Sequence, residues 1–358
     1  MQTYIIYILT VLIAVGLSRL ADKKDKRKYI TFAALVLTLV AGLRAATVGI
    51  DTPQYTRYFG LIAEGKLNLV YGLEDSFVFI CGVLLKIWNN ANFLYTVFAL
   101  ITNLLIFRRL WDFKGQISLA WATAVYCGMF YFMTFNIMRQ FVAVAIIFYA
   151  TKYLSQRKYI KYLLFVAVAF LFHKTAILGV LFVACEVFAW KHLSRRQKRF
   201  LLCAAMLVPV AAIILIKIFL SKYLRYLQNI QFNFGIMLLL KLAFFIAILL
   251  LGHLGTSAVA KNDKYGRGEY TLASVRTYYI VGLVITALGY IFPFADRIGI
   301  YFYIFEAVFM GMVAKHAKNQ TIIKICMIAL YAYILAGAIF GNSFGQAPYL
   351  FAWQQLPV

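Results

Sequence analysis

Acidic side chains are scarce in this chain. Its 358 residues include 12 Asp and Glu against 36 Lys and Arg, which gives a formal net charge of +24. The basic residues form short clusters between apolar runs and do not line one face of a polar domain, so no nucleic-acid partner is expected. Basic loops that face the anionic cytoplasmic leaflet of a membrane explain the same excess.

Cysteine, histidine and proline are also rare. The 5 Cys residues are odd in number, lie in apolar stretches and have no C-x-x-C or Cys/His spacing, so neither a disulfide nor a metal site is indicated, and no cofactor is expected. No Ser/Gly/Pro-rich linker and no repeat of fixed period divides the chain. We therefore expect a single polytopic domain over residues 1–358. The N-terminal stretch lacks the basic region and the cleavage site of a signal peptide, and we interpret it as a first span.

Hydrophobic residues, in contrast, make up 64% of the chain, more than a water-soluble domain of this size can bury. The sequence predicts an all-α, polytopic integral membrane bundle with about twelve transmembrane helices. The expected spans lie near residues 3–20, 29–45, 93–110, 117–135, 141–154, 162–172, 175–190, 200–220, 236–252, 277–293, 299–313 and 325–341.

The six basic loops between these spans fix an orientation. The positive-inside rule places all six in the cytoplasm, which requires an even number of spans between any two of them. Residues 74–88 break this parity if they cross the membrane. Their uninterrupted apolar core, 77–85, is too short for a hydrocarbon core of ~30 Å, so we expect a re-entrant or interfacial helix on the outer side. Both termini then face outward.

Two ionisable residues interrupt apolar segments on that outer side. Arg139 lies in 38 nearly continuous apolar residues, where an Arg costs ~2.5 to 3.5 kcal/mol unless it meets water or a counter-ion. His173 lies in FHKTA, at the turn of a hairpin (162–190) too short for two full spans. Arg139 could instead snorkel at a helix end, and His173 could be a satisfied core residue. Their shared side favours an anion-binding Arg next to an acid–base His.

Two further charged stretches fall on the same side. GLRAATVGIDTPQY, residues 42–55, places Arg44 at the end of the second span and Asp51 in a turn constrained by Gly and Pro. Arg297 precedes a later span, with Asp296 beside it as an ion-pair partner in the purely structural interpretation. Guanidinium groups suit a diphosphate, and a carboxylate or imidazole suits deprotonation of an alcohol. An enzyme that acts on a lipid-linked sugar diphosphate needs both kinds of group.

At these residues the chain resembles the EpsG family of Wzy-like polysaccharide polymerases. The resemblance rests on R44-x6-D51-T52-x2-Y55, on N136-x2-R139-Q140 with R157-K158 at the other end of that span, and on F172-H173-K174-T175-A176; P348-Y349 is a weaker match. It implies a bacterial inner-membrane, multi-pass glycosyltransferase with an outward-facing active site. Such an enzyme polymerises undecaprenyl-diphosphate-linked repeat units into exopolysaccharide, capsule or O-antigen chains. Its partners are a lipid-linked donor and acceptor, membrane lipid, and a chain-length regulator or flippase.

The resemblance also implies an inverting, metal-independent mechanism, and the sequence has no D-x-D pair for a metal. Arg139 stabilises the leaving diphosphate, and either Asp51 or His173 takes the acceptor proton; the sequence does not choose between them. The residues expected to bind substrate are Arg44, Thr52, Tyr55, Asn136, Gln140, Lys174, Arg297 and Tyr349.

Two other classes of membrane protein remain open as alternatives. In a membrane O-acyltransferase that modifies cell-surface glycans, His173 would be the base toward an acyl donor. A transporter or flippase would need comparable charge in the inner half of the membrane. Charges at that depth are few, namely Glu186, Lys217 and Lys241.

Overall fold

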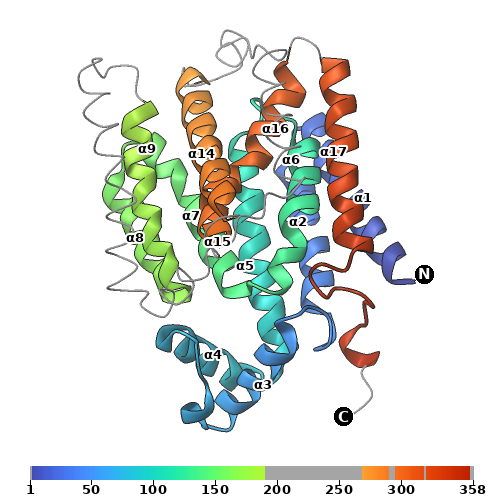
Figure 1. Cartoon of the computed structure of the whole chain (residues 1–358), viewed down its shortest axis with the longest axis vertical. Coiled ribbons are helices and arrows are strands. Elements are labelled where there is room, and N and C mark those ends of the chain that lie inside the picture. The colour runs from blue at the N-terminus through green and yellow to red at the C-terminus, as the bar shows by residue number, and fades with distance from the viewer. Residues whose placement is uncertain (1, 190–267, 290–294, 318–319, 355–358) are drawn as a thin grey trace.

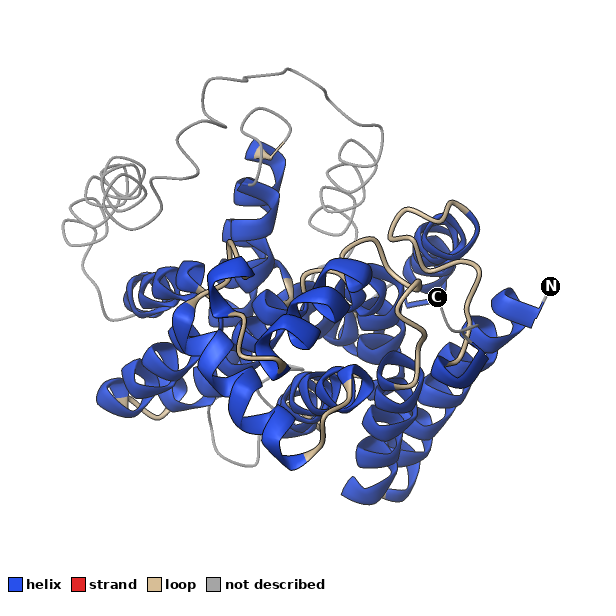
Figure 2. Ribbon diagram, turned by 90° about the horizontal axis from the view of Figure 1, so that it is seen from below, coloured by secondary structure: helices blue, strands red, loops and turns tan. Residues whose placement is uncertain are grey.

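The computed structural model describes residues 2–189, 268–289, 295–317 and 320–354. This part of the chain consists of helices and loops and contains no β-strand (Figure 2). The all-α class predicted from the sequence is therefore confirmed for these residues. The expected spans 200–220 and 236–252 lie outside the described residues.

The helices follow the apolar segments closely. The longer ones are α1 (Gln2–Lys24), α2 (Arg27–Gly42), α5 (Ala91–Asp112), α7 (Met138–Ser155), α8 (Tyr159–Phe172), α14 (Gly268–Leu288), α16 (Phe305–His316) and α17 (Gln320–Phe340). The shorter ones are α3 (Thr52–Ala63), α4 (Asp75–Ile87), α6 (Leu119–Tyr126), α9 (Leu181–Ala189) and α15 (Ala295–Tyr303).

The predicted number of spans is not confirmed. Within the described residues, three helices are long and apolar enough to cross a membrane: Thr3–Lys24, Ala91–Asp112 and Thr321–Phe340. Helices α15 and α16, which meet at a bend of 44°, make a fourth if they form one span. The other apolar segments are shorter or broken, as α8 is at His173, so length and composition do not establish them as full crossings.

Helix α7 is the centre of the described bundle. Its side chains from Gln140 to Phe148 are all buried, and it contacts α5, α8, α9 and α15. A helix that is apolar on every side is typical of a core position. Because α7 begins at Met138, Arg139 lies in its first turn, at the end of the bundle where neighbouring helices also have their termini.

Helices α3 and α4 lie together across the lower end of the bundle in Figure 1. Helix α4 has 13 residues and is therefore about 20 Å long, too short to cross a hydrocarbon core of ~30 Å. This agrees with the predicted re-entrant or interfacial helix at 74–88.

Three of the basic segments, 23–28, 108–114 and 314–320, meet at the opposite end of the described bundle. Lys114, Lys315 and Lys324 line one shared cavity, and Lys114 forms an ion pair with Asp25 across the cavity wall. Asp25 follows α1, Lys114 follows α5, Lys315 lies in the last turn of α16 and Lys324 lies near the start of α17. Their convergence is what a common cytoplasmic side for the basic loops requires.

Cysteine labelling checks this two-sided arrangement. In a cysteine-free background, Glu64→Cys at the end of α3 and Gln156→Cys at the end of α7 place single thiols at two exposed positions. We expect a membrane-impermeant maleimide to label position 64 in intact cells and position 156 only after permeabilisation. Labelling of both positions in intact cells would contradict the topology.

Candidate active site

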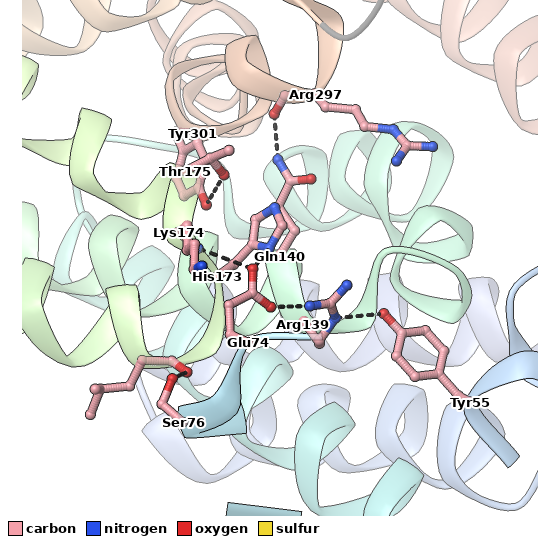
Figure 3. A network of polar contacts seen from close by, with 11 residues as sticks. Tyr55, Glu74, Ser76, Arg139, Gln140, His173, Lys174, Thr175, Arg297 and Tyr301 are labelled. Atoms are coloured by element: carbon pink, nitrogen blue, oxygen red, sulfur yellow. Dashed lines mark hydrogen bonds and ion pairs between the residues drawn. The ribbon is translucent and has the colours of Figure 1, made fainter. Parts of the chain in front are cut away.

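Arg139 and Glu74 form a partly buried ion pair between the first turn of α7 and the start of α4. Arg139 lies in the first turn of α7, where the helix dipole disfavours a cation, and Glu74 lies immediately before α4, where the dipole favours an anion. Arg139 Nη1 donates to Glu74 Oε2 (Figure 3). The side chains are 15% and 4% exposed, so the counter-charge that an Arg at this depth requires comes from Glu74.

The second oxygen of Glu74 holds the turn that contains His173. His173 Nδ1 lies 3.1 Å from Glu74 Oε1, and the backbone N–H of Lys174 donates to the same oxygen at 3.3 Å. His173 caps the end of α8 in an extended conformation and begins the 3-10 segment Lys174–Val180. One carboxylate therefore binds the guanidinium and the imidazole together (Figure 3).

These contacts change the acidity of Glu74. Burial by itself raises the pKa of the carboxyl group, but the hydrogen bond with His173 and the charge of Arg139 outweigh it and lower the pKa from 4.5 to about 2. Glu74 is therefore an anion at every physiological pH. A carboxylate of this kind is a poor proton acceptor and a good counter-ion.

The sign of this shift gives a stability prediction. The pKa of Glu74 is lower in the folded protein than in the unfolded chain. The contribution of its ionised carboxylate to the free energy of unfolding is therefore complete above about pH 4.5 and is lost as the pH falls toward about 2. In thermal unfolding of the purified protein in detergent, the Tm of Glu74→Gln should lie well below that of the wild type at pH 6. The difference between the two Tm values should decrease toward pH 3. A gap of constant size across that range would contradict this assignment.

Tyr55 connects the first motif to this cluster. Its hydroxyl accepts a hydrogen bond from Arg139 Nε at 3.1 Å. Burial raises the pKa of Tyr55, Arg139 lowers it and Asp51 raises it, so Asp51 lies close enough to act on the same hydroxyl. Within the described residues, the Asp51 carboxylate makes no hydrogen bond to Arg139 or His173; its backbone N–H donates to Asn136 Oδ1 at 3.3 Å.

The two arginine motifs meet at the carbonyl of Phe135. This oxygen accepts from Arg44 Nη2 at 3.2 Å and from Thr52 Oγ1 at 3.3 Å. Gly49, with φ +108°, allows the chain to turn beside them, since a Cβ there would lie 2.5 Å from Thr52 Oγ1 and 3.0 Å from Asn136 Oδ1. The constrained turn predicted at this position is present.

Arg44 and Tyr349 are more enclosed than the sequence predicts for substrate ligands. Arg44 is 1% exposed, donates to the carbonyl of Ala41 and lies over the rings of Tyr95 and Phe135. Tyr349 is 4% exposed and donates to Val40 O at 3.0 Å. Both side chains therefore help to hold the segment that carries Asp51 in position.

The C-terminal segment also holds the segment that carries Asp51 in position. It pairs with residues 43–50 through backbone bonds such as Gly49 N–H to Gly345 O at 2.7 Å and Ala45 N–H to Leu350 O at 2.8 Å. Asn136 Nδ2 donates to Phe344 O at 2.9 Å, so the predicted ligand Asn136 joins three distant segments. Its side chain does not cap α7.

Two exposed cations adjoin the network. Lys174 follows His173, and Arg297 receives a hydrogen bond at its backbone oxygen from Gln140, the residue after Arg139. Thr175 and Tyr301 form a further link between the His173 turn and α15, with their hydroxyls 3.0 Å apart. The predicted residues Lys174 and Gln140 therefore adjoin the Arg139 cluster, and Arg297 meets it through its backbone oxygen, with its guanidinium directed away from His173 (Figure 3).

Glu74 is the residue that sequence reasoning misses. In the sequence it is only an acidic residue at the start of the segment 74–88. A usable signal is present, because one of just 12 acidic residues immediately precedes a helix too short to span. Its partners are 65 and 99 residues away in the chain, so no local pattern connects them.

The cluster has the parts of an acid–base site for an anionic substrate. A carboxylate that binds one nitrogen of an imidazole orients the ring and stabilises its protonated form. Cations beside it stabilise negative charge as it develops on a leaving group. Among the described residues, no group of three or more His, Cys, Asp or Glu side chains is placed to hold a metal ion.

Comparison with known proteins identifies a family. The family model described as "EpsG family" covers residues 27–351, nearly the whole chain and every residue of the cluster. No curated protein and no solved structure matches the chain.

Proposed function

The chain belongs to the EpsG family of Wzy-like polysaccharide polymerases, and from this premise we propose that it extends glycan chains carried on undecaprenyl diphosphate at the outer face of the bacterial cytoplasmic membrane. The observation that carries the proposal is the single carboxylate of Glu74, which binds both His173 and Arg139. A glycosyl transfer from a diphosphate needs a base and a cationic site side by side.

His173 is the proposed base. Glu74 binds Nδ1, which leaves the proton transfer to Nε2. The acceptor hydroxyl gives its proton to Nε2 while its oxygen attacks the anomeric carbon of the donor chain. The bond from that carbon to the diphosphate oxygen breaks, and its electron pair leaves with undecaprenyl diphosphate. Attack from the face opposite the leaving group inverts the anomeric centre.

The leaving diphosphate is assigned to the cations around His173. Arg139 lies within the network, and Lys174 and Arg297 are exposed beside it. Arg44 is assigned a positioning role, because it is buried against Tyr95 and Phe135. No bound metal is required, since three cations supply the positive charge.

Asp51 remains the second candidate for the base. It lies one helical turn before Tyr55, which contacts Arg139, and it is partly exposed. The contacts of Glu74 favour His173, because they fix the imidazole and not the carboxylate of Asp51.

Purified protein in vesicles tests the function directly. Supplied with a defined oligosaccharide on undecaprenyl diphosphate, it should produce a ladder of products spaced by one repeat unit, with release of undecaprenyl diphosphate. Transfer of an acyl group without a change in glycan length would support the acyltransferase alternative, and passage of substrate across the bilayer without extension would support a flippase.

A further inference from the structure

Helix α4 has two apolar faces, and none of the described residues covers the second. Phe77, Cys81 and Leu85 recur every four residues and are buried against the bundle. Phe79 and Ile87, on another face, are 72% and 71% exposed, with Val83 between them at 46%. An interfacial helix in a membrane protein meets lipid with such a face.

A second apolar stripe, exposed within the described part of the chain, adjoins it on α8. Leu164, Val168 and Leu171 are 62%, 46% and 44% exposed. Ser76 Oγ donates to Leu171 O at 2.6 Å, which fixes the first turn of α4 against the last turn of α8. The stripe on α8 ends at this contact, and the stripe on α4 begins within one turn of it.

The charged cluster lies at the same junction. Glu74 immediately precedes α4, and His173 immediately follows α8. Lys174, exposed, comes next in the chain. Cationic groups therefore stand at the point where two apolar stripes meet, which is the pattern that fits an amphiphile with an anionic head and a long hydrocarbon tail.

We propose that the exposed faces of α4 and α8 form the docking surface for the isoprenoid tail of the diphosphate-linked substrate. This rests on the proposed function, which puts the diphosphate at Arg139, Lys174 and Arg297. A tail attached to a diphosphate at Lys174 would lie against the adjoining faces of α4 and α8. The surface therefore selects for a lipid-linked diphosphate over a water-soluble one.

Photocrosslinking tests this surface. Phe79 is replaced by p-benzoylphenylalanine, and Phe340 of α17, which is 58% exposed, receives the same substitution as the matched control. In Figure 1 α17 lies on the opposite side of the bundle from α4. The probe is radiolabelled undecaprenyl diphosphate in phospholipid vesicles. We expect about tenfold more labelling at 79 than at 340, as a modest site preference over bulk lipid gives.

Two controls establish what the crosslink reports. Excess unlabelled undecaprenyl diphosphate should remove the labelling at 79, and Lys174→Glu should lower it to the level at 340 without changing 340. Equal labelling at both positions, or a protein–protein crosslink at 79, would overturn the docking surface. Polymerisation by the wild type in the same vesicles separates the outcomes: equal labelling with a product ladder rejects only this inference, whereas enriched labelling without a ladder rejects the proposed function and leaves the surface in place.

Discussion

His173→Gln is expected to lower the rate of glycan extension by roughly 10² to 10⁴-fold, the range for loss of a general base. Glutamine can still donate a hydrogen bond to Glu74, so the packing around the carboxylate is kept, but it cannot take a proton at neutral pH. Product ladders from reconstituted vesicles measure the rate, and thermal unfolding in detergent checks that the variant is folded.

His316→Gln is the matched control. This histidine lies at the opposite end of the bundle, with Nε2 2.8 Å from Gln116 O, and its replacement should leave extension unchanged. Asp51→Asn decides between the two candidate bases. If His173→Gln still polymerises at the wild-type rate and Asp51→Asn does not, the base is Asp51 and Glu74 does not orient the base.

Glu74→Gln is the second large effect. It removes the charge that balances Arg139 and the anion that orients His173, while keeping the size of the side chain. In Ser-His-Asp enzymes, loss of the orienting carboxylate costs about 10⁴-fold in rate, and we expect a loss of roughly 10² to 10⁴-fold for this protein. Part of the effect is structural, because the variant leaves Arg139 buried beside a neutral partner.

The pH dependence separates positioning from simple destabilisation. Without the negative charge of Glu74, the protonated imidazole is less favoured, so the acidic limb of the rate profile should move to lower pH. A purely structural role would lower the amount of active protein and leave the profile in place. Glu64→Gln is the control, since Glu64 is 57% exposed, pairs with Lys66 on the same α3–α4 unit and should tolerate the change.

Arg139 and Arg44 show which roles of the arginines the sequence can predict and which it cannot. Arg139 stands out because it interrupts an apolar run, and the cost of a buried charge points to a counter-ion or a ligand whatever the fold. Arg44 looks equally suited to a diphosphate in the sequence. Its burial under Tyr95 and Phe135 depends on helices that pack from other parts of the chain, so no motif around residue 44 contains that information.

The sequence by itself determined the all-α membrane class of the protein and the positions of the described apolar helices, and it predicts on which side of the membrane the rare charges gather. These follow from local hydrophobicity and charge, which act over a few residues. Only the tertiary structure decided which charges touch. Glu74, Arg139 and His173 come from three separate segments. Their contacts depend on the packing of α4 against α3, α5 and α8, which brings residues far apart in the chain together, so no local sequence pattern contains them.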